Sequence, residues 1–140
     1  MSFFANAAEV DCYVGGVLRL AAIDPCLGPQ LAEASLNLRL VCSDPPACLT
    51  VGLFDPVAVG LSDDPMTVDV ELACEADFLD GYFRGRHNLV EALARGEVVA
   101  RGRVSKVLKL IPVIEQTFPY YRRIIAVKDR AAFTAPGAPS

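Results

Sequence analysis

The spacing of apolar residues changes from helical to strand-like and back again, and this change limits the folds that the chain can adopt. From Ala7 to Ala22, apolar side chains recur every three or four residues, as in an amphipathic helix. Between Leu36 and Cys74, apolar and more polar residues alternate, as in strands with one buried face. After Cys74 the helical spacing returns. The sequence therefore predicts an α+β protein with helices segregated to one face of a sheet.

Five strands are predicted, most of them antiparallel. The fifth is expected at residues 97–103, after the return of the helical spacing. Short turns such as Asp44-Pro45-Pro46 separate the first four strands, and they favour a meander in which each strand pairs with the one before it. We expect one face of this sheet to be covered and the other to face water. The first four strands are expected at residues 36–42, 49–53, 57–61 and 68–74.

Helices are predicted on both sides of this region. Gly15-Gly16 is expected to weaken or bend the first helix, at about 1 kcal/mol per glycine. In the second half, Asn88 is placed to cap a short helix that Gly96 ends. A further amphipathic helix starts at Val104 and is expected to stop or kink at Pro112. The predicted organisation is one domain over residues 1–127, followed by a flexible tail over residues 128–140 that contains Pro and Gly.

The charge of the 140 residues is divided unevenly, although the net charge is only −4. Residues 1–80 carry 13 acidic and 2 basic side chains, whereas residues 81–140 carry 4 acidic and 11 basic ones. The overall acidic balance argues against a nucleic-acid partner. Hydrophobic residues make up 53% of the chain, so disorder is excluded as the dominant state. No run of 18 apolar residues occurs, and a membrane-spanning helix is therefore not expected.

The reactive side chains do not form a recognisable catalytic or metal-binding pattern. The five cysteines include no C-x-x-C pair and His87 is the single histidine, so no metal, cofactor or catalytic residue is predicted. Cys42 and Cys74 fall in phase with apolar strand positions, which indicates buried thiols in a reducing, cytoplasmic protein. Asp63-Asp64 lies in a predicted turn, where solvated carboxylates are expected. His87 lies in a loop before a helix cap.

Residues 78–110 carry glycine, polar and basic residues at a characteristic spacing. Gly85-Arg86 and Asn88 come before Ala92, which lies in a short predicted helix. Gly96 then precedes a predicted strand, and Gly102 opens a helix that contains Lys109-Leu110. This pattern resembles the signature of the sterol carrier protein (SCP) family, also called non-specific lipid-transfer proteins. The likeness covers residues 5–125, although the first half agrees only in the order of its elements and in its acidic strand.

The resemblance implies a sheet covered by helices, with an elongated apolar tunnel between them. Members of the family bind sterols, fatty acids, fatty acyl-CoA or other apolar molecules without covalent chemistry. Pro112 departs from the family pattern because it interrupts the last helix early, so the ligand cannot be transferred from any relative. Carried over by position, the expected tunnel residues are Phe78, Leu79, Tyr82, Phe83, Leu93, Val104, Val107, Leu108, Ile111, Ile114 and Phe118.

Three functions are compatible with the sequence. The first is a lipid-binding or lipid-transport domain that holds an apolar molecule in the tunnel. The second is a small biosynthetic enzyme or accessory domain that acts on a hydrophobic intermediate, with Tyr82, His87, Tyr120 and Tyr121 as its polar groups. The third is an interaction module whose interior is filled by its own side chains, since the same apolar stripes are typical of an ordinary core.

Basic residues cluster between Arg84 and Lys109. They are expected either to form a solvated face that pairs with the acidic half, or to form a rim at a tunnel mouth. Such a rim would hold an anionic headgroup, CoA phosphates or an anionic membrane surface. The candidates for the rim are Arg84, Arg86, Arg103 and Lys106.

Overall fold

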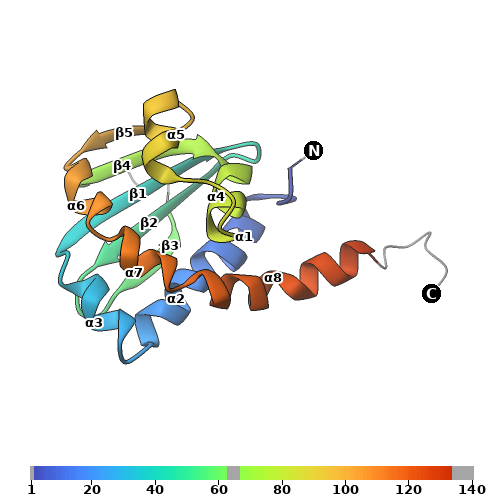
Figure 1. Cartoon of the computed structure of the whole chain (residues 1–140), viewed down its shortest axis with the longest axis horizontal. Helices are drawn as coiled ribbons and strands as arrows, with labels where there is room; N and C mark the ends of the chain where they lie inside the picture. Colours follow the sequence, from blue (N-terminus) through green and yellow to red (C-terminus); the bar gives the residue numbers. More distant parts are fainter. Residues whose placement is uncertain (1, 63–66, 134–140) are drawn as a thin grey trace.

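The computed structural model describes residues 2–62 and 67–133, and the predicted turn acids Asp63 and Asp64 lie outside these ranges. Its centre is a five-stranded sheet in the order β3-β2-β1-β4-β5 (Figure 1). This arrangement confirms the predicted α+β class and the mostly antiparallel sheet. The strands are β1 (Leu36–Ser43), β2 (Ala47–Leu53), β3 (Ala58–Leu61), β4 (Val70–Glu75) and β5 (Val99–Gly102).

The predicted meander is wrong at the fourth strand. β4 does not pair with β3 but returns to the other side of β1 and runs parallel to it, with Leu72 beside Leu40 and Cys74 beside Cys42. β3 has four residues and none of them is buried, so it forms an edge of the sheet. β1 is longer and contributes buried leucines. It lies at the centre of the sheet, where it pairs with a strand on each side. The remaining neighbours in the sheet are antiparallel.

The predicted alternation of buried and more exposed residues is present in the three central strands. In β2 every second residue from Ala47 to Leu53 is buried, and in β4 Val70, Leu72 and Cys74 are buried. The intervening residues are half-buried along most of both strands. Because side chains of a strand point alternately to its two faces, the buried set forms one continuous apolar face of the sheet. The helices cover this face (Figure 1).

The N-terminal helical segment contains a π-helical turn that ends at Gly15, the first of the two glycines expected to weaken or bend it. α1 (Ala7–Val10) continues into a π-helical turn, η1 (Asp11–Gly15), and then into α2 (Gly16–Ile23). The π-helical turn adds one residue to a helical repeat, and Val10, Val14 and Val17 nevertheless all stay fully buried. After a break at Asp24, α3 (Leu27–Ala32) leads into β1.

One helix of the second half, α5 (Leu89–Arg95), begins and ends with the predicted capping residues. It follows β4 and α4 (Ala76–Phe83). The Asn88 side chain accepts a 3.0 Å hydrogen bond from the backbone N–H of Glu91, and Gly96 ends α5 with a positive φ of 78°. Both assignments are therefore confirmed.

Pro112 has a different role from the predicted one. α6 (Val104–Leu108) ends before the proline is reached, and α7 (Ile111–Glu115) has Pro112 in its first turn. A proline suits this position because its ring fixes φ near the helical value and the missing N–H has no partner in the first turn. Pro112 thus starts a helix rather than stopping one.

The last helix, α8 (Phe118–Phe133), extends away from the sheet at its C-terminal end (Figure 1). The predicted boundary of the tail at residue 128 falls inside this helix, and residues 134–140 lie outside the described part of the chain. Tyr121 and Ile125 anchor the helix in the core, where they are 0% and 2% exposed. Apolar residues recur at helical spacing up to Val127, and charged residues follow. A boundary placed at this change in composition therefore comes before the end of the helix.

Candidate functional site

An apolar cavity of about 80 Å³ lies between the covered face of the sheet and the helices. Side chains from β1, β2 and β4 line one side of it, and side chains from α2, α4, α5, α6 and α7 line the other. Apart from Tyr82, every lining residue is aliphatic or phenylalanine. The residues are Leu18, Leu38, Leu40, Val51, Leu53, Leu72, Phe78, Leu79, Tyr82, Phe83, Leu89, Val107, Leu110, Ile111 and Ile114.

The structure brings many of the predicted tunnel residues together around this cavity. Of the predicted set, Phe78, Leu79, Tyr82, Phe83, Val107, Ile111 and Ile114 line it. The other predicted residues, Leu93, Val104, Leu108 and Phe118, are partly buried and do not line it. Phe118 packs behind the lining, because its ring meets the edges of Tyr82 and Phe83 at centroid distances of 5.4 and 6.2 Å.

The prediction missed the half of the lining that comes from the sheet, from α2 and α5, and from Leu110. The sheet contributes Leu38, Leu40, Val51, Leu53 and Leu72. All five occupy the alternate strand positions that were predicted to face the covered side, so the period-two pattern that predicted the strands also carried the signal for these wall residues. The family resemblance, in contrast, implied tunnel residues on the helices and the C-terminal segment alone.

The hydroxyl of Tyr82 is the polar side-chain group in the cavity lining. Burial, and to a smaller extent the nearby charge of Glu115, raises the pKa of its hydroxyl to about 12. The hydroxyl is therefore protonated at neutral pH and suits hydrogen bonding to a ligand better than proton abstraction.

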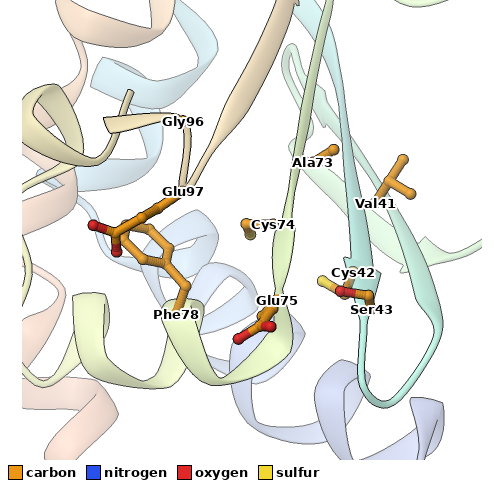
Figure 2. A pocket seen from close by; sticks show the side chains of 9 residues that line it. All are labelled: Val41, Cys42, Ser43, Ala73, Cys74, Glu75, Phe78, Gly96 and Glu97. Atoms are coloured by element: carbon orange, nitrogen blue, oxygen red, sulfur yellow. The ribbon is translucent and has the colours of Figure 1, made fainter. Parts of the chain in front are cut away.

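A larger, open pocket of about 550 Å³ lies at the C-terminal ends of β1 and β4 (Figure 2). Phe78 lines both this pocket and the apolar cavity, and its ring stacks on His87 at 5.2 Å. We call it the β4-end pocket. Its lining comprises Val41, Cys42, Ser43, Ala73, Cys74, Glu75, Phe78, Gly96 and Glu97.

Cys42 and Cys74 lie side by side in the β4-end pocket. They are register partners on parallel strands, and both are buried. A hydrogen bond between the two side chains, together with burial, raises the pKa of the Cys74 thiol. Cys74 is therefore a protonated thiol at neutral pH, in keeping with the buried strand position predicted for it.

A third pocket, of about 380 Å³, lies at the opposite end of β1, between α3 and the α6–α7 region. Leu110 lines both this pocket and the apolar cavity. We call it the α6-end pocket. Its lining comprises Gln30, Glu33, Ala34, Lys106, Lys109, Leu110 and Val113.

The predicted basic rim is divided among different environments. Arg84 is held by two carboxylates, Asp80 at 2.8 Å and Asp129 at 3.1 Å, and its guanidinium lies 4.7 Å from the centre of the Phe3 ring. Burial opposes its charge, but the hydrogen bonds to these two carboxylates raise its pKa overall. Arg86 and Arg103 are exposed and line none of the three pockets, whereas Lys106 lines the α6-end pocket.

The other polar candidates do not converge on the cavity. Tyr121 donates a 2.7 Å hydrogen bond to Asp80, Tyr120 donates one to Asp24, and His87 is exposed. Within residues 2–62 and 67–133, no three His, Cys, Asp or Glu side chains gather closely enough to hold a metal ion. No helix in the same ranges is both long and apolar enough to cross a membrane.

Comparisons with known proteins give matches in structure alone. No protein-family model matches the chain, and no curated protein matches it significantly in sequence. The apo form of sterol carrier protein 2 from Yarrowia lipolytica superposes with a TM-score of 0.62 at 19% identity, over 84% of this chain and 98% of that one. A UbiJ-SCP2 ubiquinone synthesis protein superposes with a TM-score of 0.60 at 17% identity, over 79% of this chain and 89% of the other.

A further match is the sterol carrier protein 2 of Aedes aegypti in complex with palmitate. Its TM-score is 0.55 at 21% identity, over 77% of this chain and 93% of that one. These superpositions cover most of each partner and agree with the resemblance seen in the signature residues. The chain therefore has the fold of the sterol carrier protein 2 domains.

Proposed function

We propose that the chain binds a long apolar molecule non-covalently in the cavity between sheet and helices, and carries it. The observation that supports this most directly is the lining of the cavity, in which aliphatic and aromatic side chains from eight elements meet around a space that they leave unfilled. A void of this kind costs stability, because its walls lose packing contacts. An apolar ligand would restore those contacts.

Binding requires the cavity to open. Its volume of about 80 Å³ is well below the roughly 300–1,000 Å³ of typical ligand pockets. Displacing Phe78 or Leu110 would join it to the β4-end or the α6-end pocket, each several times larger. A long ligand would therefore select a conformation in which one of these side chains has moved.

The proposed ligand contacts are the predicted tunnel residues that line the cavity, together with the leucines and valine of the sheet. The likeness to the palmitate complex from Aedes aegypti supports a fatty acid or a similar lipid as the class of ligand. We further propose a cytoplasmic location, because Cys42 and Cys74 lie side by side in the sheet and yet remain thiols. A transient contact with an anionic membrane would be made by the exposed basic residues.

A binding assay with a cavity-filling variant tests this proposal. Displacement of a fluorescent fatty acid and native mass spectrometry would measure binding to the wild-type chain and to Leu40→Phe/Leu72→Phe. Leu40 and Leu72 are neighbours in the sheet and both line the cavity, so the two rings would occupy it. Val99→Phe on the exposed side of β5 is the matched control. Equal binding by all three proteins, or none by the wild type with any class of lipid, would refute the proposal.

A second candidate is an accessory role in the biosynthesis of a hydrophobic metabolite, which the likeness to the ubiquinone synthesis protein favours. In that case the domain would present a bound intermediate to an enzyme, with Tyr82 as the polar group at the cavity. Tyr82→Phe should then lower product formation in the host while lipid binding is retained. Unchanged product formation would remove this role for Tyr82.

A further inference from the structure

The apolar cavity lies between two open pockets and shares one lining residue with each. Phe78 is the one residue shared by the lining of the cavity and of the β4-end pocket, and Leu110 is the one shared with the α6-end pocket. Both side chains are 8% exposed. Movement of either one would therefore connect the cavity to solvent.

The three spaces follow one another along β1. Ala34, just before the strand, lines the α6-end pocket, Leu38 and Leu40 line the cavity, and Cys42 lines the β4-end pocket. α3 and α4 correspondingly lie at opposite ends of β1 (Figure 1). At the usual rise per strand residue, the path from Leu36 to Cys42 is roughly 20 Å long. A path of this length along one strand suits a long single chain.

The two pockets carry opposite charge. The charged groups of the β4-end pocket are the carboxylates of Glu75 and Glu97, which Figure 2 shows near the start of α4 and beside Gly96. Arg95 approaches Glu97 at 3.7 Å, in an exposed pair that offsets part of that charge. Glu75 has no ion-pair partner within the described ranges.

The α6-end pocket has an excess of positive charge. It contains Lys106 and Lys109, three residues apart and therefore on adjoining positions of the helical surface, against the single carboxylate of Glu33. Neither lysine has a carboxylate within ion-pair distance in the described part of the chain. The Gln30 amide is already used in a 3.0 Å hydrogen bond to the Cys26 carbonyl, so the lysines are the main free donors.

From these observations we infer that the cavity and its two pockets form one channel with a fixed polarity, which takes a single-chain amphiphile with an anionic head. The inference rests on the proposed lipid binding. The head lies in the α6-end pocket, where Lys106 and Lys109 bind it through charge-assisted hydrogen bonds. The tail passes Leu110 and runs along β1 towards Phe78. The reverse orientation would place an anion beside Glu75 and Glu97, which repel it.

Ligands with the same chain and different heads test this polarity. Affinities of the full chain for palmitate, hexadecanol, hexadecyltrimethylammonium and palmitoyl lysophosphatidic acid would be measured by displacement of a neutral fluorescent lipid. We expect palmitate to bind about tenfold more weakly to Lys106→Gln/Lys109→Gln than to the wild type, and hexadecanol to bind both within about twofold. Added salt should weaken palmitate binding to the wild type more than to the variant. Palmitate and lysophosphatidic acid distinguish a carboxylate from a phosphate head.

Glu75→Gln/Glu97→Gln is the matched control, because it removes the same number of charges from the other pocket. We expect it to bind palmitate as well as or better than the wild type. Equal palmitate affinity in the lysine variant, or a loss in the glutamate variant, would overturn the polarity and leave the lipid-binding proposal intact. If none of the lipids binds the wild type, both fail together. The substituted side chains are exposed or half-buried, and circular dichroism would verify that both variants fold.

A photoreactive fatty acid locates the tail directly. With a diazirine at the methyl end of palmitate, the inference predicts crosslinks to the peptide that contains Phe78. Crosslinks to the peptide that contains Leu110 and Lys109 would show the opposite orientation.

Discussion

Tyr121 donates a buried 2.7 Å hydrogen bond to Asp80, and this bond joins the last helix to α4. Tyr121 is fully buried and Asp80 is 8% exposed. The carboxylate also accepts from Arg84, which in turn pairs with Asp129. Burial and the bond to Asp80 raise the pKa of the Tyr121 hydroxyl, so it is protonated at neutral pH and can act as the donor.

Tyr121→Phe should therefore lower the free energy of unfolding by about 1.5–3 kcal/mol, since it removes a hydrogen bond to a charged group in the core. Urea denaturation at pH 7 would measure the change. Tyr120→Phe is the control, because its hydroxyl bonds to Asp24 near the surface and its loss should be smaller. A larger effect at Tyr120 would contradict the role assigned to Tyr121.

The ion pair between Glu9 and Lys128 predicts a dependence of stability on pH. The hydrogen bond from Lys128, followed by that from the Ala5 backbone, lowers the pKa of Glu9 below its usual 4.5. A depressed carboxyl pKa stabilises the folded state above the unfolded value, and the stabilisation is lost as the pH falls through the folded value. Glu9→Gln should thus be less stable than the wild type at pH 7 and approach it below pH about 4. Thermal unfolding across this range would test it, and a constant difference would exclude the mechanism.

Two glycines should differ in their tolerance of alanine. At Gly102, φ is +90° and a Cβ would lie 2.0 Å from the Asp69 carbonyl oxygen, so the backbone of the sheet would have to move. At Gly81 a Cβ would meet the His87 ring at 2.2 Å, and an exposed side chain can swing away. We expect Gly102→Ala to cost at least about 2 kcal/mol and Gly81→Ala clearly less. Chemical denaturation of the two variants gives the ranking.

The cysteines should differ in their rate of alkylation. Cys12 and Cys26 are exposed, whereas Cys74 is buried and its thiol pKa is raised. Because the thiolate is the reactive form, iodoacetamide at pH 8 should modify Cys12 and Cys26 at least about tenfold faster than Cys74 in the folded protein. Peptide mass spectrometry at successive times would follow each site. Alkylation in urea, where every cysteine is accessible, gives the reference rates. Equal rates at Cys12, Cys26 and Cys74 in the folded protein would contradict the buried placement of Cys74.

The sequence predicts local structure well where a residue acts through its neighbours along the chain. Asn88 and Gly96 bound α5 because capping depends on adjacent backbone groups, and the alternation from Val70 to Cys74 marks a strand with one buried face. The parallel pairing of β4 with β1 was not predictable in this way. The pairing depends on which edge of the sheet offers the longer apolar strand. It is made by residues that are far apart in the chain.

The candidate site shows the same division. The aromatic stripe of α4 could be assigned to the cavity from its spacing and its family likeness. Arg84 could not be separated from the other basic residues, because Asp80 is in its own helix but Asp129 approaches from α8. Leu110 was overlooked as a wall of the cavity because its role follows from the break between α6 and α7.

The attachment of α8 has a consequence for how the protein is made. Asp80 lies in the middle of the chain, yet the groups that complete its environment, Tyr121 and the Arg84 partner Asp129, are synthesised much later. A nascent chain that ends before them exposes the apolar walls of α4 and leaves a carboxylate without its hydroxyl donor. The environment of Asp80 is therefore completed only once the α8 segment that carries Tyr121 and Asp129 is free to pack against α4.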